Sequence, residues 1–210
     1  MVVDLSADVV VGGPLEQCDV SALFIAFQEG PFMSKAAVPR PEPAVADIPR
    51  PSRRAVRAAY ASAFSATVGF IPLHSVWALG IPLWADKNKF RDWYAVGGGP
   101  YMFVLSGMAV MAGVLALSLV RPWGLVFPSW VPLVAGRRVP PRTLASTAFT
   151  VAALLLLYTV WAAILTVIQW NTPGIFSRWI VAYGIPQFLV WGIGLLIAAH
   201  SYRSRTTPHH

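Results

Sequence analysis

Four long stretches of the sequence contain no Asp, Glu, Lys or Arg, and short polar segments separate them. These uncharged stretches cover residues 58–85, 95–120, 143–177 and 179–202. About 20 apolar residues in a helix cross the roughly 30 Å hydrocarbon core of a bilayer, so each stretch is long enough to span it. The sequence therefore predicts an all-α fold, an integral membrane four-helix bundle. Its helices are expected near residues 58–84, 99–120, 143–170 and 179–200.

The composition supports a membrane protein. Of the 210 residues, 56% are hydrophobic and 12% are charged, and the mean hydropathy is +0.60, whereas a soluble domain is about 25% charged. This length fits one bundle, which we expect over residues 53–205. Cys18 is the only cysteine, which excludes an internal disulfide, a CxxC redox pair and a cysteine-based metal site.

Residues 1–52 differ in character from the rest of the chain. They hold seven of the nine acidic residues, and residues 36–52 are rich in proline. Proline lacks an amide donor and interrupts helices, so we expect a disordered, proline-rich cytoplasmic tail of polyproline type. Met33 opens a segment that reads like an ordinary protein start. Our hypothesis is therefore that residues 1–32 come from a start codon placed too far upstream.

The positions of Lys and Arg predict the orientation, because short cytoplasmic segments carry an excess of these residues. One side of the predicted bundle holds ten arginines, whereas the other holds two lysines and two arginines. We therefore expect a multi-pass protein of the bacterial plasma membrane with both termini in the cytoplasm. The bases expected to contact lipid headgroups are Arg53, Arg54, Arg57, Arg137, Arg138 and Arg142. Since these bases flank apolar spans, the expected partners are membrane lipids and not nucleic acid.

The predicted inner loop, residues 121–142, is apolar and aromatic but contains five prolines. Prolines at this density exclude a continuous spanning helix. Its Trp and Val residues beside Arg137 and Arg138 predict a segment that lies in the cytoplasmic interface of the membrane. The alternative is a binding element for a cytoplasmic partner.

Polar side chains inside a span are costly and are candidates for function. Counting along the helices, we expect His74 about 15 Å below the outer end of the first helix and Gln187 about 12 Å below the start of the fourth. Tyr158 and Thr159 are expected about 16 to 18 Å deep in the third helix. This polar layer has two interpretations. The side chains form hydrogen bonds that tie helices together, or they line a small ligand-binding pocket in which His74 contacts the ligand.

The predicted spans contain no Asp or Glu, so they cannot supply paired carboxylates or a Ser-His-Asp triad. We therefore expect a protein that is not an enzyme by itself. His74 and His200 are expected about 24 Å apart along the bundle, so they cannot share one iron. The expectation is that the protein holds no haem, no metal and no other cofactor.

Small residues recur at helical spacing in the second predicted span. Ala109 with Gly113, and Ala112 with Ala116, allow another helix to approach closely. The approaching helix belongs either to the same chain or to a second copy. The small residues are therefore compatible with a homo-oligomer or with a membrane protein partner.

Two segments resemble a known group of proteins. They are His74-x-x-Trp77-Ala78-Leu79-Gly80 in the first predicted helix, and Val131-Pro132 followed by Gly136-Arg137-Arg138-Val139-Pro140 in the inner loop. Together with four predicted spans, they resemble small four-helix membrane proteins of unknown function that are common in actinobacteria. The resemblance covers approximately residues 55–200 and implies this topology and a bacterial plasma membrane.

The sequence predicts a structural or accessory component of the plasma membrane. The first alternative is a small-solute or lipid permease subunit that uses the polar layer around His74. It predicts that His74→Ala abolishes function while insertion stays normal. The second alternative is a membrane sensor or resistance partner that acts through the proline-rich tail and the inner loop. It predicts that deletion of residues 33–52 abolishes function whereas His74→Ala does not.

Overall fold

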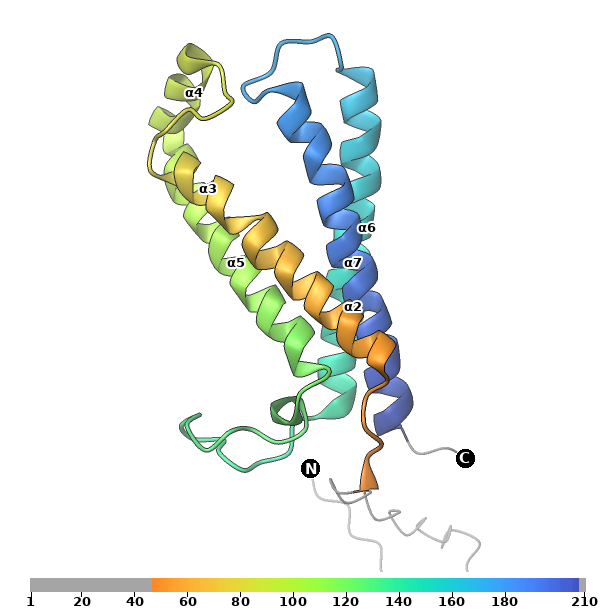
Figure 1. Cartoon of the computed structure of the whole chain (residues 1–210). Helices are drawn as coiled ribbons and strands as arrows, with labels where there is room; N and C mark the ends of the chain where they lie inside the picture. The colour runs from red at the N-terminus through yellow and green to blue at the C-terminus, as the bar shows by residue number, and fades with distance from the viewer. Residues whose placement is uncertain (1–46, 208–210) are drawn as a thin grey trace, which may run out of the picture. The chain divides into compact units, whose positions relative to one another are not determined.

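The computed structural model describes residues 47–207, which are helical and form no β-strand (Figure 1). The prediction of an all-helical fold is confirmed for this part of the chain. The elements are α2 (Arg53–Phe64), the π-turn η2 (Ser65–Gly69), α3 (Ile71–Ala78), α4 (Lys87–Trp93), the π-turn η3 (Tyr94–Gly98), α5 (Gly99–Ser118), the 3₁₀-turn η4 (Pro122–Gly124), α6 (Pro141–Ile168) and α7 (Arg178–Thr206). Most of the predicted tail, together with Cys18 and Met33, lies outside the described residues.

Three helices of the described part are long and apolar enough to cross a membrane. They cover Lys87–Ser118, Pro141–Ile168 and Arg178–Thr206. They correspond to the second, third and fourth predicted spans. The chain is therefore compatible with a membrane protein.

The first predicted span, residues 58–84, is a broken helix instead of a continuous one. The π-turn η2 and Phe70 separate α2 from α3. Pro72 is the physical reason on the α3 side, because it lacks the N–H that would continue the helical ladder. The helix ends at Ala78 and not near residue 84, since Gly80 has a φ of +82° that suits glycine and closes the helix.

A short helix that the sequence analysis did not predict precedes α5. Asp86 caps α4, because its carboxylate accepts hydrogen bonds from the N–H groups of Asn88 (3.1 Å) and Lys89 (3.0 Å). Gly97, with a φ of +106°, makes the kink between α4 and α5. The second apolar helix therefore starts at Lys87, about three turns earlier than the predicted start.

The two ends of the helical part differ in the elements that they hold. We call the end where α2 and α6 begin and α7 ends the basal end, and the end with α4 and the loop of residues 169–177 the distal end (Figure 1). α6 packs on α7, α2 packs on α7 and α5, and α3 packs on α5. The broken helix thus leans on α7 near the basal end and on α5 near the distal end.

The basal core consists mainly of alanines. Its buried members are Ala55, Ala59, Ala63, Ala116, Leu119, Val120, Ala145, Ala148, Ala152, Leu195, Ala198, Ala199 and Tyr202. Small side chains let helices approach closely. The distal core is built from larger groups, namely Trp77, Ala78, Phe90 and Met102 with the partly buried Trp93 and Phe176 beside them. Side-chain size therefore changes along the bundle.

Pro49 and Ser52, near the end of the predicted tail, form hydrogen bonds with the helices. The Pro49 carbonyl accepts a hydrogen bond from the Arg205 guanidinium (3.1 Å). The Ser52 hydroxyl accepts one from the Ala55 N–H (3.2 Å) and caps α2. Both residues therefore contact the helical part of the chain.

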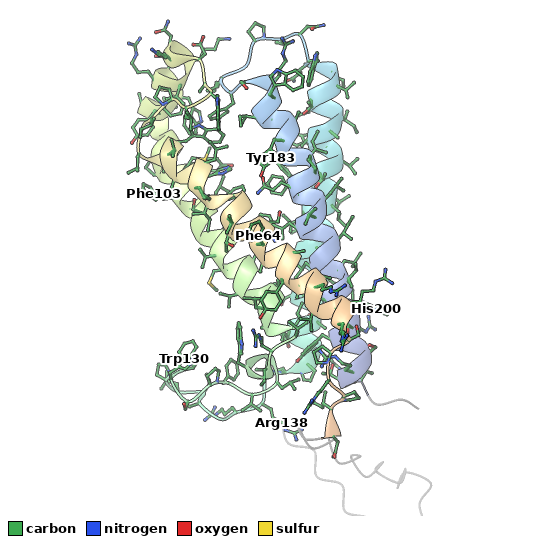
Figure 2. All side chains as sticks on the ribbon, in the orientation of Figure 1. Phe64, Phe103, Trp130, Arg138, Tyr183 and His200 are labelled. Carbon is green, nitrogen blue, oxygen red and sulfur yellow. The ribbon has the colours of Figure 1, made fainter. Side chains whose placement is uncertain are left out.

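The predicted inner loop folds back on itself beyond η4. Val126 and Arg138 form an isolated antiparallel bridge, and the Val139 N–H donates to the Leu125 carbonyl at 3.0 Å. Trp130 lies at the far end of this loop, away from the helices (Figure 2). Trp130 is 78% exposed and Leu133 is 92% exposed. The loop thus presents apolar side chains at its tip.

Candidate functional site

Two hydrogen bonds join the first helix to α7. They connect Gln187, a residue of the predicted polar layer, with Ser65, which was not predicted. The Ser65 hydroxyl donates to the Gln187 carbonyl at 2.8 Å, and the Gln187 amide donates to the Ser65 carbonyl at 3.2 Å. Ser65 is the first residue of the π-turn η2. The Gln187 side chain therefore holds the first helix at the point where it leaves regular α geometry.

A second serine extends this contact toward the basal end. Ser62 is buried, and its hydroxyl donates to the Trp191 carbonyl at 2.9 Å. We call the three hydrogen bonds made by Ser62, Ser65 and Gln187 the serine seam. Hydrogen bonds of this kind between helices are typical of packing in membranes.

His74 is held by its own helix. Its Nδ1 lies 2.8 Å from the Phe70 carbonyl, which can only accept, so Nδ1 carries the hydrogen. The imidazole stacks on the Phe70 ring at 3.5 Å between centroids and meets the Trp77 ring edge-on at 5.2 Å. Both the hydrogen bond and the ring contacts fix the orientation of the imidazole.

The expected depth of His74 requires a correction. Because α3 ends at Ala78, His74 lies about 6 Å from the end of its helix and not about 15 Å. It also lies about 7.5 Å further along the helix than Gly69, whose backbone faces the Gln187 side chain. His74 and Gln187 therefore occupy neighbouring levels of the bundle and not one layer.

Tyr158 and Thr159 of α6 point in different directions. Thr159 is 2% exposed, and its hydroxyl donates to the Leu155 carbonyl of the same helix at 2.7 Å. Tyr158 is partly exposed, and its ring meets Phe188 edge-on at 5.0 Å. Phe188 in turn lies edge-on to Phe70 at 5.9 Å. Ring contacts therefore connect Tyr158 with His74 across three helices, whereas Thr159 is not part of this chain of rings.

Trp191 contributes a buried polar group without a partner. Its side chain is 5% exposed, and its indole N–H has no hydrogen-bond partner within residues 47–207. The indole ring stacks on Phe188 at 5.7 Å and meets Phe70 edge-on at 5.9 Å. The aromatic rings around it supply packing contacts but no acceptor in the plane of the indole.

The distal end of the described part contains a pocket. Its volume is about 650 Å³, within the usual range of about 300 to 1,000 Å³ for ligand sites. Its lining comes from the second half of α6, the loop of residues 169–177, the start of α7 and residues 84–86. We call it the distal pocket. Of the predicted site residues, Tyr158 lines it.

The sequence analysis missed the distal pocket because two separate loops form it. The Asp86 N–H donates to the Ile175 carbonyl at 2.8 Å, and the Ser177 N–H donates to the Trp84 carbonyl at 2.8 Å. Such pairing leaves no pattern in either segment alone.

The six arginines predicted to contact headgroups are exposed in the structure. Arg53, Arg54 and Arg57 lie in the first turns of α2, and Arg142 lies in the first turn of α6. Arg137 and Arg138 lie on the return of the inner loop (Figure 2). These elements share the basal end.

The small residues of α5 pack within the chain. Ala109 and Ala116 are buried in the bundle. A Cβ added at Gly113 would lie 3.3 Å from the Thr67 methyl group of η2. The close approach predicted from the sequence is therefore used by the first helix of the same molecule.

No family model, no curated protein and no solved structure matches the chain. Among residues 47–207, no group of three or more His, Cys, Asp or Glu side chains is arranged to hold a metal ion.

Proposed function

We propose that this protein crosses the bacterial plasma membrane four times, with both termini in the cytoplasm, and acts there as a structural or accessory component and not as an enzyme. The observation that carries the proposal is the packing of the broken first helix on two apolar helices: α2 packs on α7 and α5, and α3 packs on α5. A segment placed between two spans in this way shares their environment.

The dimensions of the first helix support a fourth crossing. From Arg53 to Ala78 it contains 26 residues, counted from the bounds of α2 and α3, which gives a length of about 39 Å against about 30 Å of hydrocarbon. The side turned away from the bundle is apolar at Phe64 and Val68, which are 63% and 56% exposed. Lipid tails are the natural cover for such side chains.

The arginines support the proposed orientation. Arg53, Arg54, Arg57, Arg137, Arg138 and Arg142 gather at the basal end. The positive-inside rule assigns this end to the cytoplasm, where anionic headgroups attract the guanidinium groups. The apolar tip of the inner loop, with Trp130 and Leu133, then lies at the same interface.

The serine seam supports a structural interpretation of the polar layer. The side-chain amide of Gln187 donates to the Ser65 backbone carbonyl, and the Gln187 backbone carbonyl accepts from the Ser65 hydroxyl. The His74 Nδ1 is hydrogen-bonded to the Phe70 carbonyl. Polar groups engaged in this way stabilise the contact between helices. They have fewer free positions for a transported solute.

Specific observations favour the two other candidate functions. The π-turn and the break at Phe70 interrupt the first helix inside the bundle, and interrupted helices occur at transporter binding sites, which favours a permease subunit. The exposed Trp130 and Leu133 beside Arg137 favour a sensor that docks a partner through the inner loop. The proline-rich part of that hypothesis lies outside the described residues.

Cysteine accessibility in intact cells tests the topology. In a Cys18→Ser background, single cysteines replace Lys89, Ser129, Thr172 or Ser204, and an impermeant maleimide is added. Four crossings predict labelling at positions 89 and 172 only. Labelling at 129 or 204 from outside would contradict the proposed orientation, and opposite sidedness of 89 and 172 would contradict crossing by both α5 and α6. A further single cysteine at Arg50, before α2, tests the fourth crossing: four crossings predict no labelling there, whereas labelling at both 50 and 89 would contradict crossing by the first helix.

The role is tested separately by comparing His74→Ala with Ser65→Ala in the same cells. A structural role predicts that Ser65→Ala lowers the amount of inserted protein more than His74→Ala does. A permease predicts the opposite, a loss of function with His74→Ala at normal protein level. Deletion of residues 33–52 is the matched test of the sensor hypothesis.

A further inference from the structure

We propose that the distal pocket binds a membrane phospholipid, with the lipid phosphate at Arg178 and one acyl chain along the pocket face of α6. The proposal rests on α6 and α7 crossing a bilayer. It requires neither the proposed orientation nor the fourth crossing by the first helix.

The lining of the pocket changes from apolar to polar along α6. Tyr158, Trp161 and Leu165 line it along the second half of α6, and Gln169 lines it where that helix ends. From Tyr158 to Gln169 the helix rises about 16 Å. An elongated ligand with an apolar end at membrane depth and a polar end at the interface matches this order.

The rim carries a positive charge available to an anion. The Arg178 guanidinium lies over the Trp170 ring, 5.6 Å from its centroid. Arg178 forms no ion pair with a carboxylate of residues 47–207. The Trp170 ring holds the guanidinium by a cation–π contact but leaves its N–H donors free for a phosphate oxygen.

The one carboxylate in the lining is engaged elsewhere. Asp86 lines the pocket, but its Oδ1 accepts hydrogen bonds from the N–H groups of Asn88 and Lys89 and caps α4. The Lys89 ammonium reaches the same rim and donates to the Pro173 carbonyl at 2.7 Å. Two bases therefore stand near one capping carboxylate, which favours an anionic group over a cationic one.

The pocket is formed before any ligand arrives. The backbone pairing of residues 84–86 with residues 175–177 closes one side of it. Trp170 and Trp179 pack edge-to-face at 5.4 Å and connect the loop of residues 169–177 with the first turn of α7, where Arg178 lies. A site with fixed walls loses less conformational entropy when it binds.

Membrane placement selects a lipid over a soluble phosphate ester. Trp161, which lines the pocket, is 56% exposed and continues onto the outward side of α6. If α6 crosses a bilayer, this side meets lipid tails, so a bound acyl chain can enter the pocket sideways. A free phosphate would fill the rim and leave the Tyr158 and Leu165 part empty.

The test is native mass spectrometry of the full chain, purified in an uncharged detergent. The probes are phosphatidylglycerol, a diacylglycerol with the same acyl chains, and glycerol phosphate without chains. We expect phosphatidylglycerol to stay bound at a concentration at which diacylglycerol and glycerol phosphate do not. Arg178→Gln is expected to weaken phosphatidylglycerol binding about tenfold, because a charge-assisted contact to the phosphate is lost.

Two further variants separate the site from general effects. Arg91→Gln removes an exposed base of α4 that does not line the pocket and should leave binding unchanged. Ala162→Trp fills the apolar part of the pocket and should block phosphatidylglycerol while the helical circular dichroism stays the same.

Three results would overturn the proposal. They are equal binding of diacylglycerol, equal binding of glycerol phosphate, and an equal effect of Arg91→Gln and Arg178→Gln. Because the assay uses micelles, a wrong topology in the proposed function would not change its result.

Discussion

The basal and distal halves of the bundle are packed by different means. In the basal half, alanines fill the contacts between α2, α6 and α7, and the helices run close together. In the distal half, aromatic rings fill the space between α3, α4 and the loop of residues 169–177. The comparison shows how side-chain size sets the distance between helices.

A glycine allows the backbones of α2 and α7 to approach closely near the basal half. A Cβ built on Gly194 would lie 2.6 Å from the Ala58 carbonyl oxygen and 3.0 Å from the Ser62 Cβ. The backbones of α7 and α2 therefore touch at a place where even a methyl group does not fit. Such close contacts compensate for the missing hydrophobic driving force between helices in lipid.

Rings act as spacers in the distal half. Trp77 packs on Phe176 at 4.2 Å between ring centroids, and Phe176 meets Trp93 edge-on at 5.6 Å. Rings of this size hold the loop of residues 169–177 away from α3 while still contacting it. The distal pocket lies in this more widely spaced half.

The largest expected effect is removal of a distal ring. Trp77→Ala should lower the free energy of unfolding by about 3 to 5 kcal/mol, since it leaves a large cavity and also removes the hydrogen bond from the indole N–H to the Leu83 carbonyl (2.9 Å). Thermal unfolding in detergent, followed by circular dichroism, measures this. Trp161→Ala is the control, because that ring is more than half exposed. Equal effects of the two substitutions would argue against rings as spacers.

A methyl group in the basal half is expected to have the next largest effect. Gly194→Ala should destabilise the protein by about 1 to 3 kcal/mol, because the added Cβ collides with the backbone of α2. Gly107→Ala makes the same chemical change where nothing lies within 4 Å. The same unfolding assay should show a lower midpoint for Gly194→Ala alone. Tolerance of Gly194→Ala would mean that α2 and α7 are not in close contact.

A smaller effect is expected where α7 holds the inner loop. The Tyr202 hydroxyl is buried and donates to the Gly124 carbonyl at 2.9 Å, so Tyr202→Phe should cost about 1 kcal/mol. Titration with sodium dodecyl sulfate gives the free energy of unfolding. Tyr183→Phe, on an exposed ring of the same helix, serves as the matched control and should leave the titration unchanged.

The smallest effect concerns the serine seam between the two halves. Ser65→Ala removes one hydroxyl bond to α7, and bonds of this kind average about 0.6 kcal/mol and reach about 1.7 kcal/mol in membrane proteins. Gln187→Leu removes the other bond, which the Gln187 side-chain amide donates to the Ser65 backbone carbonyl, so a double-mutant cycle in the same titration is expected to give additive effects. A coupling energy of zero would show that the two residues stabilise the bundle independently.

Much of the helical organisation could be predicted from local sequence. The uncharged stretches after Gly99, Pro141 and Arg178 correspond to α5, α6 and α7, because hydropathy depends on composition over a single window. The end of the first helix at Ala78 was predicted less accurately than the positions of these three helices. Its position depends on the combined effect of Pro72, Gly80 and the π-turn, and local rules weigh these signals poorly.

The candidate site was less accessible to sequence reasoning. The polar residues were identified by type, but their partners were not, because helix rotation is absent from a hydropathy profile. His74 was expected at the depth of Gln187, whereas the structure places it beside Phe70 and Trp77. Ser65, which Gln187 contacts, was not singled out, since a serine in an apolar helix has no distinctive pattern.

What the sequence determined by itself is therefore the class of the protein: helical, apolar over three long helices, and basic beside them. These properties follow from the free energy of transfer of each residue between water and hydrocarbon, which does not depend on the residue's tertiary contacts. The tertiary structure decided where helices touch and where they separate. The bond between Ser65 and Gln187 joins residues 122 positions apart, and the distal pocket needs two loops that pair only after the helices have packed. Contacts of this range depend on the size and rotation of side chains in the assembled bundle.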